Sequence, residues 1–147
     1  MKFAIEKISD TWDEAHDLML ENHKETGSTD SIEFNPDKDK YLAIENVGLM
    51  KLFTARDEGK LVGYAIFLIS VHLHYSCQLW AMQDVMFMKN THRGIGSYRF
   101  MKWVDEELAN LGVNVVLRSV HVRKDYSRIL EKIGYQKIET SFMRRFN

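Results

Sequence analysis

Two glycines, Gly94 and Gly96, lie where a strand-like run passes directly into a helix-like one. A helix N-terminus has unpaired N–H groups and the positive end of the dipole, so it can hold an anion. Glycine lets a phosphate approach without a Cβ in the way. A Walker loop needs Gly-Lys-Ser/Thr after its first glycine, and a dinucleotide fingerprint needs a third glycine where this chain has Arg99. The turn is therefore predicted to bind phosphate outside both classes, with a simple bend as the alternative.

His72 and His74 alternate with Leu73 in a strand-like run, so both are expected on one face, with Tyr75 on the other. On one face they could converge on a single ligand or proton. Two imidazoles at this spacing could also bind a metal, although no third ligand is evident. A polar strand end with satisfied histidines is the structural alternative.

The composition is that of one globular domain spanning residues 1–147. Lys and Arg total 20 against 21 Asp and Glu, and this balance argues against nucleic-acid binding, which needs a basic excess. The single cysteine, Cys77, excludes an intrachain disulfide framework and a thiolate zinc site. The chain start is too charged for a secretory signal, and the longest apolar run, 64–69, is too short to span a bilayer. We expect a soluble cytoplasmic protein with no membrane partner.

Hydrophobic periodicity predicts the order β-α-α-β-β-β-α-β-α-β, an α/β mixed sheet with helices packed on it. Thr11 and Glu14 have the spacing of a capping box, so a first helix is expected there, running to about Lys24. Pro36 suits the start of a short second helix. The other helices are expected from Gly96 to 111 and at 125–133, and strands at 1–8, 49–56, 61–74, 79–88, 113–120 and 135–146.

Segment 85–97 resembles motif A of the GNAT (Gcn5-related N-acetyltransferase) family, in which a strand is followed by Gln/Arg-x-x-Gly-x-Gly/Ala and a helix. Gly94 and Gly96 match the two glycine positions, whereas Thr91 stands at the usual Gln/Arg position. Segment 129–135, Ile-Leu-Glu-Lys-Ile-Gly-Tyr, resembles the end of motif B. The predicted element order is also that of this family.

Four further segments, 53–57, 61–64, 72–75 and 84–87, are similar to GNAT proteins often encoded by phages and prophages. In those proteins His-x-His-Tyr follows the third strand, and Asn/Gln-Asp-Val begins the second half of the fourth. The resemblance covers residues 36–146, and it does not supply the acceptor.

The resemblance implies a GNAT fold with six to seven strands, about four helices and a splay between the fourth and fifth strands. It implies acetyl-CoA as cosubstrate and no metal. Pantetheine would pair with the free backbone of the fourth strand, and the amides of the glycine turn would hold the pyrophosphate. Arg123 and Lys124 follow the fifth predicted strand, where both could contact CoA phosphates, with an exposed basic turn as the alternative. The implied cofactor-binding residues are Val85, Met86, Phe87, His92, Arg93, Gly94, Ile95, Gly96, Ser97 and Arg123.

Transfer to an amine needs a neutral amine, a stabilised oxyanion and a protonated thiolate. Asp84 stands just before the implied splay, where related families place a carboxylate that acts directly or through water. The alternative is a strand aspartate paired with a nearby Lys or Arg. We interpret His72 and His74 as an acceptor-side proton relay with Asp84. Leu130 occupies the position of the family's acid tyrosine, and Tyr126, one turn earlier, is either its substitute or a core aromatic.

The sequence therefore predicts an acetyl-CoA-dependent N-acetyltransferase acting on a primary amine by direct attack on the thioester. The acceptor is a small metabolite, a polyamine-like or antibiotic-like amine, or a protein amino group. One rival is a non-catalytic acyl-CoA-binding or phage-associated interaction module, suggested by Leu130 and Thr91. Another is a metal-dependent enzyme using His72 and His74. A homodimer paired through an edge strand is compatible with this fold.

Overall fold

The computed structural model describes residues 1–27 and 32–146. In these ranges the apolar runs form five strands and four helices, with one short 3-10 turn before α3. No helix in the same ranges is long and apolar enough to cross a membrane. The elements are β1 (Lys2–Glu6), α1 (Ile8–Thr26), α2 (Lys38–Asn46), β2 (Met50–Asp57), β3 (Lys60–His72), β4 (Tyr75–Met88), the turn η1 (Asn90–His92), α3 (Ile95–Asn110), β5 (Val115–Leu117) and α4 (Ser127–Lys132).

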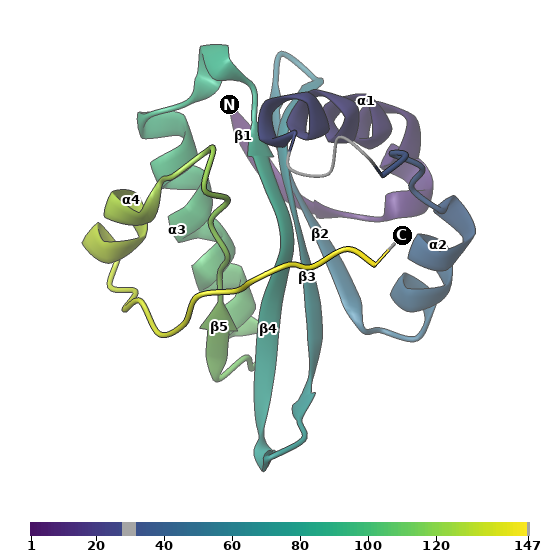
Figure 1. Ribbon diagram of the computed structural model, residues 1–147. Coiled ribbons are helices and arrows are strands. Elements are labelled where there is room, and N and C mark those ends of the chain that lie inside the picture. Colours follow the sequence, from purple (N-terminus) through teal and green to yellow (C-terminus); the bar gives the residue numbers. More distant parts are fainter. Residues whose placement is uncertain (28–31, 147) are drawn as a thin grey trace.

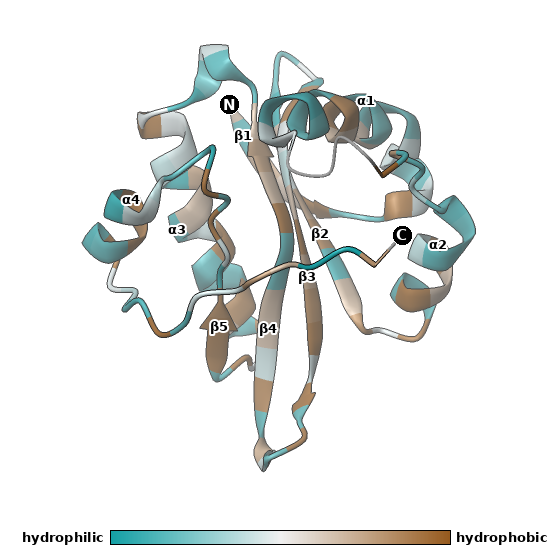
Figure 2. Cartoon of the chain, in the orientation of Figure 1, coloured by the Kyte–Doolittle hydropathy of each residue, from teal (hydrophilic) through white to brown (hydrophobic). Residues whose placement is uncertain are grey.

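The strands form one sheet in the order β1-β2-β3-β4-β5. The first three pairings are antiparallel and the last is parallel, so the predicted mixed α/β sheet is confirmed. Residues 61–67 of β3 are buried without interruption, because this central strand is covered on both faces. In Figure 2 hydrophobic residues run along much of β3 and β4, whereas the helices carry both hydrophilic and hydrophobic residues.

Helices α3 and α4 cover one face of the sheet, and α1 and α2 cover the other (Figure 1). Each face has its own apolar layer, so a ligand reaches strand backbone at the edges of the sheet and where strands separate. Large, fully buried side chains include Phe53, Phe67, Phe100 and Leu108 in the α3–α4 layer, and Ile8, Met50, Leu52, Tyr64, Ile66 and Phe87 in the α1–α2 layer.

The first helix begins earlier than predicted. Ile8 opens α1 without a side-chain cap, and Thr11 lies inside the helix, where its hydroxyl donates to Glu6 Oε2 at 2.9 Å. Glu14 is taken by Arg56, whose Nη1 lies 2.9 Å from Glu14 Oε2. The predicted capping box is wrong, because a long-range ion pair holds the carboxylate that the box requires.

The prediction of six to seven strands is also wrong for the described residues, which form five. Residues 135–146, predicted as the last strand, are assigned to no strand and run from α4 toward α2 in Figure 1. β5 is only three residues long, so it has few backbone N–H and C=O groups with which a further strand could pair. Phe142 and Phe146 in this segment are 94% and 78% exposed.

Candidate active site

Strands β4 and β5 separate soon after they meet. Their parallel pairing joins residues 80–82 of β4 to Val115–Leu117, whereas β4 continues to Met88. On its other edge β4 stays paired with β3 as far as Met88. Within the described residues, the second half of β4 therefore has one free backbone edge, which is the splay predicted between the fourth and fifth strands.

Asp84 is the extra residue of a β-bulge at the start of this splay. Gln83 lies opposite Phe67 and Val85 lies opposite Ile66, so Asp84 has no partner on β3. A bulge bends the strand and re-aims the side chain at that point. No hydrogen bond or ion pair holds the Asp84 carboxylate within residues 1–27 and 32–146. Asp84 is exposed, and partial desolvation by the protein around its carboxyl raises its pKa. An unpaired carboxylate of this kind is suited to accept a proton near neutral pH.

Two tyrosines lie within the field of the Asp84 charge. Tyr64 of β3 is fully buried, and its hydroxyl has no hydrogen-bond partner in the described part of the chain. Burial raises the pKa of Tyr64, and the charges of Tyr41 and Asp84 raise it further. Burial also raises the pKa of Tyr41, with Asp84 contributing. Because both tyrosines pack in the α1–α2 layer, the Asp84 carboxylate acts on that face of the sheet.

The glycine turn joins β4 to α3. Gly94 has φ 77° and ψ −116°, a conformation that only glycine adopts readily, and Ile95 begins the helix. No side chain caps α3, so the first-turn amides up to Ser97 keep their capacity to hold an anion. A Cβ built on Gly94 meets nothing within 4 Å, so the space beside the turn is open. These features fit an anionic group held by backbone amides.

The side chains of the same turn are engaged elsewhere. His92 Nε2 lies 3.1 Å from Asp57 Oδ2. Arg93 donates from Nε to the carbonyl oxygen of Met88 at 2.8 Å, and from Nη2 to Glu25 Oε2 at 2.7 Å. Both side chains brace the turn against neighbouring elements. Direct contact of His92 or Arg93 with a cofactor stays a prediction.

Lys124, in the loop between β5 and α4, reaches the C-terminal end of α1. Its Nζ lies 2.9 Å from Glu25 Oε2 and 4.5 Å from the centre of the Phe87 ring. Burial favours the neutral form of Glu25, but hydrogen bonds from Lys124 and Arg93 lower its pKa overall. Glu25 could not be predicted from the sequence, because it carries no signal beyond its place on a polar helix face. Arg123 is exposed in the same loop, where contact with a phosphate stays a prediction.

Tyr126 places a hydroxyl where the β4–β5 pairing stops. The hydroxyl accepts from Gln83 Nε2 at 3.1 Å and donates to the carbonyl oxygen of Ser119 at 3.2 Å. Gln83 Nε2 also donates to Ser119 O at 3.0 Å, so one side chain spans the gap that the backbone pairing leaves. Leu130 is 7% exposed and packs in the α3–α4 layer. Tyr126, the suggested substitute for the family's acid tyrosine, therefore brings a hydroxyl to the start of the splay, whereas Leu130 has none to offer.

No family model matches this sequence, and the search of curated proteins finds no match. Solved structures do match. Ribosomal-protein-alanine N-acetyltransferase from Brucella melitensis biovar Abortus 2308 aligns over 99% of this chain and 100% of its own, with a TM-score of 0.74 and 18% identity. Glucosamine-6-phosphate N-acetyltransferase from Arabidopsis thaliana aligns over 100% of both chains, with a TM-score of 0.72 and 15% identity. This chain has an acetyltransferase fold.

A third structure bears on the cosubstrate of this acetyltransferase fold. A predicted acetyltransferase from Clostridium acetobutylicum, solved with acetyl-CoA, aligns over 98% of this chain and 95% of its own, with a TM-score of 0.69 and 12% identity. At such identities the likeness concerns the fold. The first two proteins are named for different acceptors, a ribosomal-protein alanine and a sugar phosphate, so the fold leaves the acceptor open.

The two histidines lie at the far end of the acetyltransferase fold from Asp84. β3 ends at His72 and residues 73–74 form the turn, so His74 does not share a strand face with His72 as predicted. His74 N donates to His72 Nδ1 at 3.1 Å, and the His72 ring packs 4.1 Å from the Trp80 ring. His72 is six positions beyond Ile66, which is about 20 Å along the strand. The predicted relay with Asp84 is therefore not formed.

The metal-dependent rival gains no support from the described residues, among which no three His, Cys, Asp or Glu side chains converge.

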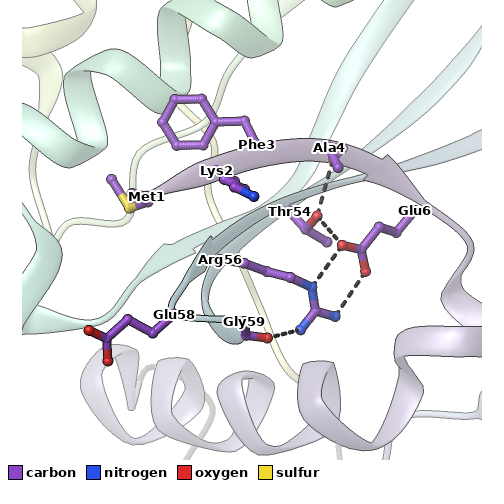
Figure 3. A pocket seen from close by; sticks show the side chains of 9 residues that line it. All are labelled: Met1, Lys2, Phe3, Ala4, Glu6, Thr54, Arg56, Glu58 and Gly59. Atoms are coloured by element: carbon purple, nitrogen blue, oxygen red, sulfur yellow. Dashed lines mark hydrogen bonds and ion pairs between the residues drawn. The ribbon is translucent and has the colours of Figure 1, made fainter.

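A cavity of about 580 Å³ lies at the β1–β2 edge (Figure 3). The guanidinium of Arg56 lines this cavity and donates to the carboxylates of Glu6 and Glu14 and to the carbonyl oxygen of Gly59. Thr54 donates to Glu6 Oε1 at 2.9 Å, as Figure 3 shows. This network stabilises strand pairing and anchors α1.

Proposed function

We propose that this chain is an acetyl-CoA-dependent N-acetyltransferase that acetylates a primary amine by direct attack on the thioester. The observation that carries the proposal is the free edge of β4. It runs from the unpaired carboxylate of Asp84 to the uncapped turn at Gly94. An extended ligand there would find backbone groups along its length, an anion site at one end and a base at the other.

The cosubstrate fits this edge by its chemistry. The pantetheine arm carries amides, which would pair with the backbone of Val85, Met86 and Phe87 as an added strand would. Its pyrophosphate would accept from the amides between Gly94 and Ser97, where the helix dipole favours negative charge. The clostridial neighbour solved with acetyl-CoA supports this choice.

Asp84 is the proposed base. An alkylammonium must lose a proton before its nitrogen attacks a thioester, and a nearby carboxylate can take that proton directly or through a water. Burial raises the pKa of Asp84, which brings its affinity for protons closer to what neutral pH requires. A backbone N–H of the splayed segment would stabilise the oxyanion.

Tyr126 is the proposed donor to the departing sulfur. Burial raises the pKa of its hydroxyl, so the phenol keeps its proton at neutral pH. The hydrogen bonds to Gln83 and Ser119 fix the hydroxyl at the start of the splay. Leu130, at the position where the resemblance implies a tyrosine, has no group that could serve.

The proposed acceptor is an amine of a small molecule or of a protein. Membership of the phage-encoded subgroup stays a prediction, and so does the homodimer. Calorimetric titration with acetyl-CoA and with CoA tests the cosubstrate. We expect dissociation constants on the order of micromolar. A screen of amines with the protein saturated with acetyl-CoA would then identify the acceptor.

A glycine pair provides the control for the cofactor site. Gly94→Glu places a side chain and a negative charge beside the α3 amides, and is expected to abolish CoA binding. Gly112→Glu changes a glycine of similar φ, 86°, with equally open space at the other end of α3, and should bind CoA as the wild type does. Undiminished binding by Gly94→Glu in the folded protein would refute the cofactor placement.

The non-catalytic rival is favoured by one observation, the burial of Leu130 where the resemblance implies an acid tyrosine. A module that only binds acyl-CoA would retain binding in Asp84→Asn and acetylate no amine. Transfer to any amine that is lost in Asp84→Asn while CoA binding persists supports the enzyme. Binding without transfer across a broad amine panel supports the module.

A further inference from the structure

Arg118 directly follows β5, and its side chain is fully buried. Its Nη2 lies 2.7 Å from Asp105 Oδ1, its Nε donates to Tyr135 Oη at 3.0 Å, and its Nη1 donates to Gln83 Oε1 at 3.0 Å. A guanidinium has five N–H donors and no acceptor, so its neighbours must all accept from it. The buried charge is thus paired with Asp105 on one side and joined to β4 on the other.

This arrangement sets the orientation of the Gln83 amide. Because Arg118 can only donate, Gln83 presents its oxygen to Arg118 and its NH2 group to Ser119 and Tyr126. The Tyr126 oxygen accepts from this NH2 group and gives its own proton to the carbonyl oxygen of Ser119. The donors therefore run in one direction, from Arg118 through Gln83 to Tyr126.

Aligned hydrogen bonds in a low-dielectric interior polarise one another. A cation at the head of the chain makes the Gln83 NH2 a stronger donor, and this in turn strengthens the donation from the Tyr126 hydroxyl. Burial raises the pKa of Tyr126, whereas the Gln83 hydrogen bond and the Arg118 charge both oppose that rise. Tyr126 is thus a better proton donor than an isolated buried phenol, and it sits where the strands part.

We propose that Arg118 and Gln83 are positioning residues that hold and polarise the Tyr126 hydroxyl, whose proton turns from the carbonyl oxygen of Ser119 to the sulfur of CoA. The inference rests on the proposed function, because it requires CoA in the splay. When the C–S bond breaks, its electron pair stays on the sulfur and the Tyr126 proton passes to it. The acceptor ammonium gives its first proton to Asp84, which passes it to solvent, and the second N–H proton, lost as the tetrahedral intermediate becomes the amide, restores the phenol. Arg118 itself does not touch the reacting atoms.

The probe for this role is CoA alone, whose thiol titrates without any acceptor. Calorimetry first establishes binding to each variant, and the thiolate absorbance of the saturated complex is then followed against pH. Tyr126→Phe removes the donor and Gln83→Leu removes its link to Arg118. Both are expected to lower the thiolate-to-thiol ratio at a fixed pH by about tenfold, which corresponds to one pKa unit.

Tyr135→Phe is the matched control, because it removes a phenol from the opposite side of the same guanidinium and leaves Gln83 and Tyr126 intact. It should titrate as the wild type does. Gln83→Glu covers a failure of Gln83→Leu to fold, since it keeps the bond from Arg118 but replaces the donor to Tyr126 with an acceptor, and should also lower the ratio. Gln83 variants that titrate as the wild type while Tyr126→Phe lowers the ratio overturn the inference alone. Identical titration in Tyr126→Phe also removes the donor role of Tyr126 from the proposed function. A wild type that binds no CoA overturns the proposed function with it.

Discussion

Glu25 at the end of α1 and Lys124 in the loop after β5 form an ion pair with a 2.9 Å distance between Oε2 and Nζ. The same carboxylate takes a hydrogen bond from Arg93 of the glycine turn. One carboxylate therefore neutralises two cations beside the proposed anion site. The contact also ties α1, the end of β4 and the loop after β5 together across the Phe87 ring.

Glu25→Gln should bind CoA more tightly, by about three- to tenfold at low salt, because Arg93 and Lys124 are then free to pair with phosphates. The gain should shrink as salt is added, since the new attraction is between partly exposed charges. Calorimetry at two ionic strengths measures both effects. Glu21 lies one turn before Glu25 in α1 and forms an ion pair with Lys89. Glu21→Gln removes that ion pair and is the control for a general change in charge. An equal gain in both variants would attribute the effect to net charge.

The glycine turn and α3 could be predicted from sequence because their signals are local. Gly94 needs a conformation that other residues avoid, and Gly112, with φ 86°, closes the helix as expected. The two-residue turn after His72 carried no such signal. Leu73 and His74 both have negative φ, so no glycine or asparagine is required there, and the alternating pattern continues through the turn.

The chemistry around Asp84 could be predicted only in part. Its type and position indicated a base, but the bulge depends on the register between β3 and β4, which no neighbouring residue encodes. The contacts of Arg118 with Gln83 and Asp105 join three elements, so spacing along the chain does not reveal them. Glu14 illustrates the opposite error, in which a valid local signal lost to a long-range ion pair with Arg56.

Tyr64→Phe should stabilise the protein. The Tyr64 hydroxyl is buried without a partner in the described residues, and a buried unsatisfied polar group costs about 1–3 kcal/mol. We expect the free energy of unfolding in urea to rise by about 1 kcal/mol. Tyr41→Phe, which removes a partly exposed hydroxyl from the same layer, should change it less. A loss of stability in Tyr64→Phe would mean that the hydroxyl has a partner in solution.

Glu6 should make stability depend on acid pH. The hydrogen bond from Arg56 is the largest of the causes that lower its folded pKa from 4.5 to about 2. A lowered folded pKa stabilises the protein above the unfolded value, and this contribution is lost as pH falls from about 4.5 toward 2. Because solvent screens the group, we expect about 1–2 kcal/mol. Urea unfolding should show Glu6→Gln weaker at neutral pH and equal to wild type at the acid end, with exposed Glu106→Gln as control.

Asp84→Asn should separate catalysis from stability. Loss of a positioned base is expected to lower the rate of transfer by about 10²- to 10⁴-fold, while CoA binding persists. The pKa of Asp84 is raised in the folded protein, which means that its ionised form destabilises the folded state. The free energy of unfolding therefore falls as pH rises from the ordinary pKa of 3.8 past the folded pKa. The uncharged amide of Asp84→Asn removes this destabilisation of the folded state. Asp84→Asn should therefore unfold at higher urea than wild type at neutral pH, and the difference should vanish below the ordinary value.

The pH profile of the wild type gives an independent check on the same carboxylate. A base must be ionised to accept a proton, so kcat/KM should fall on the acid side as Asp84 protonates, at a pH above that of an ordinary aspartate. His72→Ala is the matched control, because the histidines lie at the far end of β3 and should leave this acid limb unchanged. An acid limb that moves in His72→Ala would place a histidine in the proton path after all. A limb that survives in Asp84→Asn would show that another group is the base.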